Sequence, residues 1–457
     1  MTESKPNQDL GTGSIKKLML KMALPTVLAQ IVNLLYNIVD RIYIGHIPGI
    51  GAAALTGVGL FTPILMLLMA FAALLGSGGA PLAAIAMGKG ENDHAEKIMG
   101  NCCTVLLLLS VVLTVLFYVF APQMLWFFGA SDQTMPYALV YTRVYVLGTV
   151  FVLIVLGMNP FVTAQGFAKI SMMTTVIGAV INIVLDPIFI FGFHWGVFGA
   201  GLATALSQAV GAIWIMVFLR GKKTILRLNK SAMVVRKKIL LPCLTLGVST
   251  FVMMATESLL SMSFTTSLAK FGGDLAVGSV TILVSLTQLI NLPLQGLTQG
   301  AAPIISFNFG ARKIDRTKEA FFTMFGACVA YAVAFWATVM IFPSAMVRIF
   351  TSDKELVEFA TWAVRIYMAC IFTVGFQNSC QQSFMALGQA KVSLLLACLR
   401  KLVLLIPLIF ILPNFFENKV FAVFLAEPVS DVLAAATTTA VFLWKFPKIL
   451  KQGPKEA

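Results

Sequence analysis

Long apolar stretches recur along the whole chain and are separated by short polar segments. Clear examples lie at residues 105–120, 144–158, 321–342 and 392–412. A helix needs about 20 predominantly apolar residues to cross the hydrocarbon core of a bilayer. The residue-by-residue alternation typical of membrane β-strands is absent from these stretches. The pattern therefore predicts an all-α integral membrane protein.

Twelve membrane-spanning helices account for the apolar stretches. We expect them at 15–44, 53–86, 98–121, 136–160, 168–191, 196–219, 239–268, 275–306, 317–343, 356–384, 392–412 and 419–444. The predicted domains are an N-terminal tail at 1–14, a first six-helix lobe at 15–219, a basic linker at 220–238, a second six-helix lobe at 239–444, and a C-terminal tail at 445–457.

An internal duplication relates the two predicted lobes. Residues 222 positions apart are repeatedly identical, as in the pairs Pro81 and Pro303, Tyr145 and Tyr367, and Lys169 and Lys391. Near the start of each half the offset is 217, which aligns Asp40 with Glu257, and near the end it is 223, which aligns Thr204 with Glu427. An even number of crossings per half makes the halves parallel repeats. This organisation is common among alternating-access transporters.

Composition and charge placement fit a membrane protein with a defined orientation. The chain is 59% hydrophobic and only 11% charged, with a formal net charge of +14, which is too few charges for a soluble surface. In the twelve-helix topology, 26 of the 33 Lys and Arg residues lie on the side of both termini, including the run 220–238 and the group Lys391, Arg400 and Lys401. The positive-inside rule then predicts cytoplasmic termini. The basic run is predicted to be a loop near anionic headgroups, not a nucleic-acid surface.

No resident cofactor or metal is expected. The seven Cys lie in apolar stretches without metal-binding spacing, and the three His are scattered. Residues 1–14 lack an apolar core before a cleavage site, so we expect no cleaved signal peptide. We expect a multi-pass protein of a prokaryotic plasma membrane, a monomer whose partners are small organic molecules and membrane lipids, with no nucleic acid.

Acidic residues inside the first predicted lobe indicate an ion-coupling site. A charge at the bilayer centre costs at least ~2.5–3.5 kcal/mol, so such groups are functional candidates by default. Asn182 and Asp186 share one helix face because they are four residues apart, and Asp186 lies about 26 Å above Lys169. With Asp40 and Thr204 they are predicted to bind Na⁺ or H⁺ in the outer half of the bilayer. The competing interpretation is a structural network in which Arg41 neutralises Asp40.

Polar side chains of the second lobe are candidates for substrate binding. Glu257 is the counterpart of Asp40. It either attracts a cationic substrate or helps to couple an ion, and the competing interpretation is a buried structural hydrogen bond. Two amide stripes at helical spacing accompany it, and the predicted substrate-binding residues are Tyr36, Asn37, Glu257, Gln288, Asn291, Gln295, Asn378 and Gln381. Amide stripes also hold membrane helices together without any ligand. For Glu427 and Asp431 structural roles are favoured, because Pro428 perturbs their helix.

These motifs resemble those of the MATE (multidrug and toxic compound extrusion) transporters over nearly the whole chain. The matching segments are Leu24-Pro25, Asn37-Ile-Val-Asp40, Gly166-Phe-Ala-Lys169, Asn182-Ile-Val-Leu-Asp186-Pro187, Gly199-Ala-Gly-Leu-Ala-Thr204 and Gly296-Leu-Thr-Gln-Gly300. The resemblance implies two six-helix lobes in a V, and export of amphipathic, often cationic compounds in exchange for Na⁺ or H⁺.

The resemblance also assigns individual residues. Asp40, Asn182, Asp186 and Thr204 match the first-lobe cation or proton group of many members, and Glu257 matches the second-lobe glutamate of the sodium-coupled branch. That branch has an acid where this chain has Asn378. The resemblance with this departure favours an ion site in the first lobe and leaves Glu257 available to substrate.

Other functions fit the residues less well. A flippase for lipid-linked sugars, from the same broad superfamily, is the alternative, but such chains tend to have cationic cavities, whereas acids dominate the predicted spans here. A membrane-embedded transferase would need a DDxxD cluster or a catalytic His within a span, and neither is present. A channel would need a ring-like filter, which scattered single acids do not form.

Overall fold

The apolar stretches of the sequence fold into helices along the whole described part of the chain. The structure is a computed structural model that describes residues 10–351 and 353–454. The first half contains α2 (Ile15–Gly45), α3 (Gly51–Gly59), α4 (Thr62–Lys89), α5 (Asn92–Phe127), α6 (Met135–Leu147), α7 (Thr149–Ala164), α8 (Ala168–Pro187), the π-helix η1 (Ile188–Gly192) and α9 (Gly196–Arg220). The second half contains α10 (Lys237–Gly310), α11 (Ile314–Ile341), α12 (Pro343–Arg348), α13 (Lys354–Tyr367), α14 (Thr373–Ala386), α15 (Ala390–Cys398), the π-helix η2 (Leu399–Leu405), α16 (Ile406–Ile411), the 3-10 helix η3 (Leu412–Asn414) and α17 (Lys419–Gln452).

Local residue choices explain where several helices begin and end. Pro63 lies in the first turn of α4, where its missing N–H is harmless, and Gly90 ends that helix with φ 83°. The Asp353 side chain caps α13 by accepting from the Leu356 N–H at 3.0 Å. Within α10, Gly273 has φ 63° and ψ −157°, which reverses the chain and divides α10 into two legs, Lys237–Gly273 and Leu275–Gly310.

The number of membrane crossings agrees with the sequence prediction once two broken helices are included. Among the described residues, ten helices are long and apolar enough to cross a membrane, and the pair α6 and α7, bent by 58°, is an eleventh candidate. The remaining predicted span, 356–384, corresponds to α13 and α14, and counting it gives twelve. The expectation that 136–160 and 356–384 are continuous helices was wrong. Gly148 interrupts the first, and a turn at 368–372 interrupts the second.

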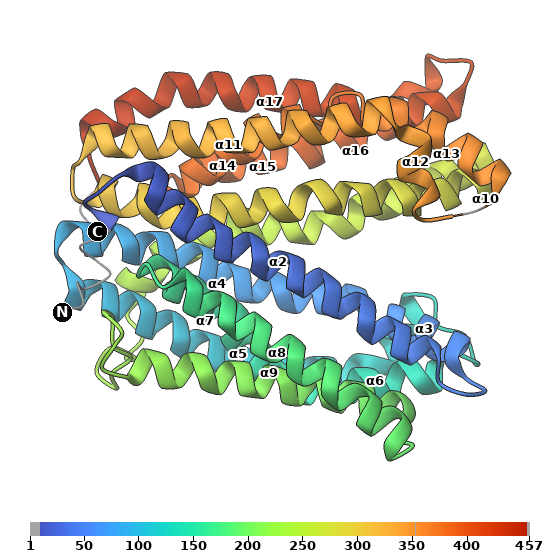
Figure 1. Cartoon of the computed structure of the whole chain (residues 1–457), viewed down its shortest axis with the longest axis horizontal. Coiled ribbons are helices and arrows are strands. Elements are labelled where there is room, and N and C mark those ends of the chain that lie inside the picture. Colours follow the sequence, from blue (N-terminus) through green and yellow to red (C-terminus); the bar gives the residue numbers. More distant parts are fainter. Residues whose placement is uncertain (1–9, 352, 455–457) are drawn as a thin grey trace.

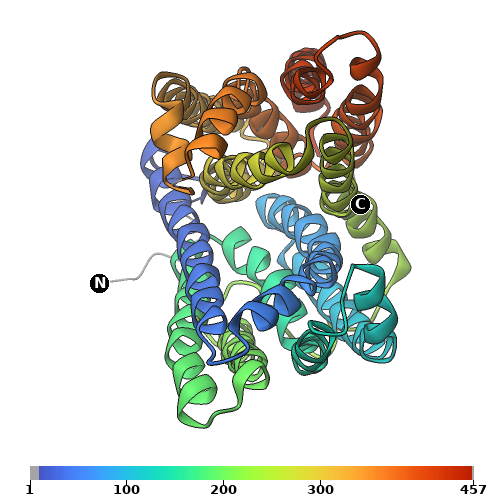
Figure 2. The same cartoon turned by 90° about the vertical axis from the view of Figure 1, so that its right-hand side faces the viewer.

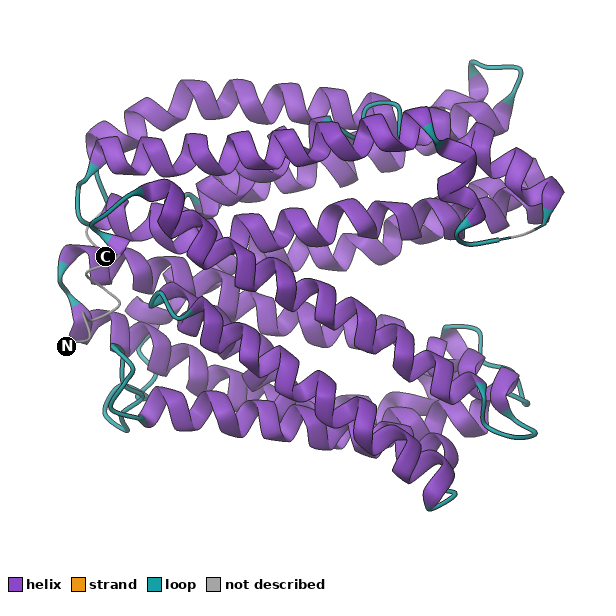
Figure 3. Cartoon of the chain, in the orientation of Figure 1, coloured by secondary structure: helices purple, strands orange, loops and turns teal. Residues whose placement is uncertain are grey.

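The helices form two lobes arranged as a V, as expected. Helices from the first half of the chain lie on one side and those from the second half on the other (Figure 2). The described chain begins and ends at the end where the lobes approach each other, and the lobes diverge toward the opposite end (Figure 1). Most loops lie at these two ends (Figure 3). We refer to the end at which the described chain begins and ends as the terminal end, and to the other as the open end.

Glycines bring the lobes together near the terminal end. A Cβ added to Gly78 of α4 would lie 2.1 Å from the carbonyl oxygen of Cys243 of α10. A Cβ at Gly88 would likewise lie 2.1 Å from the carbonyl oxygen of Phe307. The α2 helix joins this interface, since Thr26 Oγ1 donates to the Gly296 carbonyl at 2.6 Å. Close backbone packing of this kind holds membrane helices together through van der Waals contact.

The segment before α2 also ties the two lobes. Asn308 Nδ2 donates to the Leu10 carbonyl at 2.8 Å, and Lys313 Nζ donates to the Gly11 carbonyl at 2.7 Å. Arg316 Nη1 donates to the Gly13 carbonyl at 2.7 Å. Because the donors belong to the second lobe and the acceptors lead into α2, these bonds reinforce the contact at the terminal end.

Candidate functional site

The four residues predicted to form the first-lobe ion site come together near the open end. Asp40 is on α2, Asn182 and Asp186 are on α8, and Thr204 is on α9, with exposed fractions of 9%, 1%, 0% and 5%. Asn182 Nδ2 donates to Asp186 Oδ1 at 3.3 Å and lies at the same distance from Thr204 Oγ1. The carboxyl groups of Asp40 and Asp186 interact directly. Three helices therefore converge on one polar group.

This first-lobe group is rich in oxygen and short of donors. Asp40 Oδ1, Asn182 Oδ1 and Asp186 Oδ2 are buried and have no hydrogen-bond partner among the described residues. Arg41 is exposed and acts on Asp40 only through its charge, and neither aspartate forms an ion pair in the described part of the chain. Buried carboxylates without a counter-ion are unfavourable. The chemistry of these atoms therefore fits a proton or a small hard cation.

Two tyrosines that the sequence interpretation did not single out complete the first-lobe group. Tyr141 and Tyr145 of α6 have ring centroids 6.0 Å apart, and the Tyr141 hydroxyl contacts Thr204. Phe61 packs against both rings, at 5.5 Å and 4.6 Å. Tyr36, predicted to contact substrate, lies beside Asp40. The four-residue spacing of Tyr141 and Tyr145 could have indicated a shared helix face, but tyrosines of this helix were not considered for the site.

The acids of the second lobe, in contrast, are paired with cations. Lys401 forms an ion pair with Glu257 and also donates to the Met253 carbonyl at 3.0 Å. Arg400 Nη2 lies 2.7 Å from Asp431 Oδ1 and 3.3 Å from Glu427 Oε1. The Glu257 side chain is 58% exposed, whereas those of Glu427 and Asp431 are 4% and 1% exposed. The sequence interpretation considered a buried structural hydrogen bond for Glu257, whereas the structure gives it an ion pair and a largely exposed side chain.

Arg400 and Lys401 correct the charge count made from the sequence. Both were grouped with the basic residues outside the membrane at the terminal side. The structure places them in η2, within the crossing helix Ala390–Asn414. They remain there because carboxylates from α10 and α17 compensate their charge.

The predicted amides of the second lobe do not all gather at one place. Asn378 and Gln381 line a small pocket of about 20 Å³ together with Gln377, Met253, Arg400 and Lys401. This volume is room for about one water molecule. Gln381 is buried and donates to the Ser393 carbonyl at 2.7 Å, which is a helix-packing role. Asn37, Gln288 and Gln295 are exposed, Asn291 is half-buried, and none of the four lines this pocket.

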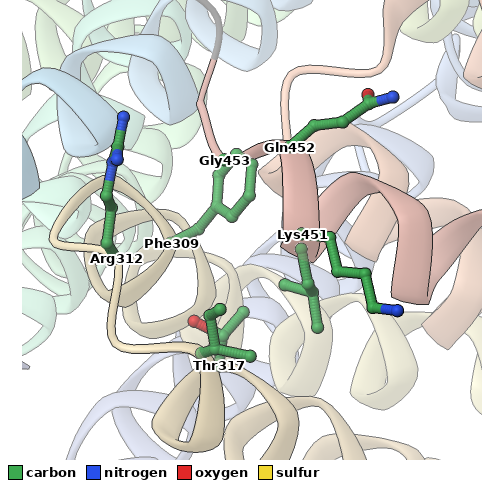
Figure 4. Close-up of a pocket in the computed structure, with 8 residues that line it drawn as sticks. Phe309, Arg312, Thr317, Lys451, Gln452 and Gly453 are labelled. Atoms are coloured by element: carbon green, nitrogen blue, oxygen red, sulfur yellow. The ribbon is translucent and has the colours of Figure 1, made fainter.

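A larger pocket of about 140 Å³ lies between the α10–α11 turn and the end of α17. Phe309, Thr317 and Leu450 line it, together with Arg312 and Lys451. The charged ends of Arg312 and Lys451 point away from each other (Figure 4). The pocket therefore has no convergent charged groups, and it lies far from the buried acids of either lobe.

Comparison with known proteins gives a consistent result over the whole length. The MatE family model matches residues 25–188 and 250–411, one segment in each lobe. Multidrug export protein MepA of Staphylococcus haemolyticus (strain JCSC1435) is 26% identical over 423 residues, 92% of each chain. A MATE crystal structure in the bent conformation has a TM-score of 0.92 at 24% identity, covering 98% of this chain and 99% of that chain. An outward-facing multidrug resistance MATE family transporter of the MOP superfamily has a TM-score of 0.91 at 23% identity, with the same coverage.

Proposed function

The chain belongs to the MatE family, and on that premise we propose that it exports amphipathic organic cations in exchange for Na⁺ or H⁺. It is a multi-pass protein of the prokaryotic plasma membrane. The observation that carries the proposal is the buried first-lobe pair Asp40 and Asp186, whose oxygens lack both a counter-ion and a full set of donors. The MepA relatives, described as multidrug export proteins, support the substrate class.

The first lobe would take up the coupling ion. A proton bound between Asp40 and Asp186 would remove one of two facing negative charges. A sodium ion would instead use the carboxylate oxygens with Asn182 Oδ1 and Thr204 Oγ1, since hard cations prefer oxygen ligands. Either ion neutralises charge that is otherwise costly to enclose between packed helices.

The second lobe would contribute the carboxylate that attracts a cationic substrate. Glu257 is suited to this role because more than half of its side chain is exposed. Methionine side chains near it, such as Met253, adapt to ligands of different shape. Asn378, and Tyr36 and Asn37 of the first lobe, remain candidates for further contacts. The two charged side chains of η2 do not favour a flippase, because carboxylates already compensate them.

Alternating access would use α2 as the connection between the ion site and the lobe interface. Residues 23–27 of α2 pack against the second lobe near the terminal end, while Asp40 lies near the open end. With cytoplasmic termini, the described state is open to the outside. Binding an ion at Asp40 would favour a different shape of α2, with Pro25 as the natural bending point. Ion and substrate must prefer different states, since equal affinity shifts no equilibrium.

Ethidium efflux from liposomes tests the exchange directly. Purified protein is reconstituted, and Na⁺ and pH gradients are imposed separately. One gradient should accelerate efflux, and Asp40→Asn should reduce that acceleration at least about 10-fold, within the range of measured coupling free energies. Glu417→Gln, on an exposed loop, serves as the matched control. Normal gradient-driven efflux by Asp40→Asn would contradict the proposed ion site.

A native cysteine pair tests the movement of the lobes. The thiols of Cys102 in α5 and Cys243 in α10 contact each other across the lobe interface. Mild oxidation should join them and stop ethidium export in the cross-linked fraction, and a reductant should restore it. Cys243→Ser should be insensitive to oxidation, whereas Cys103→Ser should behave like the unmodified protein. Undiminished export by fully cross-linked protein would rule out separation of the lobes at this interface.

A further inference from the structure

Among the described residues, the ion-pair cluster of the second lobe has one more carboxylate than it has cations, and its two buried carboxylates share one arginine. The cluster of ion pairs has three carboxylates, Glu257, Glu427 and Asp431, and two cations, Arg400 and Lys401. Three negative and two positive charges leave a net charge of −1. A net charge in a membrane-embedded cluster is unfavourable unless another positive charge joins it.

The excess negative charge is located at Glu427 and Asp431. Lys401 forms its ion pair with Glu257 and its hydrogen bond with the Met253 carbonyl. Arg400 is therefore the one cation that forms ion pairs with the other two carboxylates in the described part of the chain. Its Nη2 reaches Oε1 of Glu427 and Oδ1 of Asp431, while Nε donates to Asp431 Oδ1 at 3.1 Å. The second oxygen of each carboxyl, Glu427 Oε2 and Asp431 Oδ2, is buried and has no partner among the described residues.

Among the described residues, the other groups that act on this pair do not supply a further positive charge. Those on neighbouring elements are Glu257 of α10, Arg400 and Lys401 of η2, Tyr367 of α13 and Cys370 of the turn that follows it. Tyr367 and Cys370 are neutral in their ordinary state, so they do not supply the missing positive charge. One added proton would neutralise the excess and give one carboxyl a donor.

We propose that Glu427 and Asp431 share one proton, which forms a second proton site separate from that of the first lobe, and that this proton leaves when a cationic substrate occupies Glu257. The release step rests on the proposed function, whereas the shared proton does not. The proposed exchange balances charge. When a substrate cation neutralises Glu257, Lys401 stays in the cluster, and the two cations of η2 then balance Glu427 and Asp431 without the proton, which passes to water.

Infrared difference spectroscopy tests the shared proton without any substrate. At neutral pH the protein in lipid should show a carbonyl band of a protonated carboxylic acid that is lost in Glu427→Gln, in Asp431→Asn, or in both. Glu417→Gln, on an exposed loop, should retain the band.

Each single variant should melt near the unmodified protein, because a neutral amide resembles the protonated carboxyl. Asp431→Asn combined with Glu427→Gln should melt clearly lower, because Arg400 then lacks a counter-ion. Spectra in which neither single variant removes a band would overturn the proposal.

Proton release on binding tests the exchange. Tetraphenylphosphonium is added to purified protein in weak buffer with a pH indicator. The second-lobe site should release about one proton per bound cation, and this release should be lost in Glu427→Gln and in Lys401→Met but kept in the exposed-loop control Glu417→Gln. Release that persists in the two second-lobe variants, and disappears only in Asp40→Asn, would overturn the exchange. If the unmodified protein does not bind the cation, the proposed function fails instead, and the infrared result still decides the shared proton.

Discussion

The two lobes have the same helical layout but treat buried acids in opposite ways. In the first lobe, the polar groups around Asp40 and Asp186 are an amide, hydroxyl groups and the two carboxyl groups themselves. In the second lobe, Glu427 and Asp431 are held by the guanidinium of Arg400. At the offset of 222, the first-lobe counterparts of Arg400 and Lys401 are Gly178 and Ala179. The lobes therefore differ by two side chains of one helix. Arg400 and Lys401 give the second lobe built-in counter-ions, whereas the first lobe must bind a cation from outside.

This difference suggests a division of labour between the lobes. A carboxylate pair without a cation is stabilised most by an ion that binds reversibly, and reversible binding is what ion coupling requires. A pair with a fixed guanidinium is partly compensated, so it needs only the one shared proton proposed above. The exposed Glu257 is the one acid of that cluster that a substrate can reach. Each prediction below tests whether the presence or absence of the two cations is what distinguishes the lobes.

The largest expected effect concerns stability. Removing one partner of a buried ion pair leaves an uncompensated charge and costs about 3–5 kcal/mol. Arg400→Met should therefore lower the melting temperature strongly, since it leaves Glu427 and Asp431 without their cation. Asp186→Asn in the first lobe should leave the melting temperature unchanged or raise it, because it removes a charge that has no counter-ion. Thermal unfolding of both variants in the same lipid gives the comparison, and equal destabilisation would contradict it.

The next largest effect concerns transport. Asp186→Asn should reduce gradient-driven ethidium efflux about 100-fold, near the upper range of coupling between two sites. Glu257→Gln should reduce efflux only about 10-fold, with a raised half-saturating concentration, since losing one favourable charge contact weakens binding without removing the coupling ion. Initial efflux rates over a range of ethidium concentrations separate the two effects. A larger loss in Glu257→Gln than in Asp186→Asn would reverse the assigned roles of the lobes.

The different predictability of the two lobes has a physical reason. Helical spacing along one segment puts Asn182 and Asp186 on the same face, so this half of the predicted first-lobe group followed from local periodicity, whereas Asp40 and Thr204 were assigned from their estimated depth and from the family resemblance. The second-lobe cluster joins α10, η2 and α17, and the separations from 257 to 401 and from 400 to 431 are invisible to local patterns. Arg400 and Lys401 were counted with the basic residues outside the membrane although they lie near the middle of the predicted span 392–412, because the carboxylates that compensate them are distant in the sequence. The breaks at Gly148 and 368–372 were missed because apolar composition continues across them.

The last and smallest effect comes from giving the first lobe a cation of its own. Ala179 is 4% exposed and occupies the position equivalent to Lys401 on a helix that also carries Asn182 and Asp186. Ala179→Lys should supply the missing counter-ion and reduce the acceleration of efflux by the ion gradient about 10-fold, while basal binding of ethidium persists. Ala179→Met, of comparable length without charge, controls for the added volume. Efflux measured with and without the gradient gives the coupling directly. If Ala179→Lys folds and retains full gradient dependence, the cations of η2 do not explain why the lobes differ. If the loss is confined to Ala179→Lys, one side chain is enough to make the first lobe behave like the second.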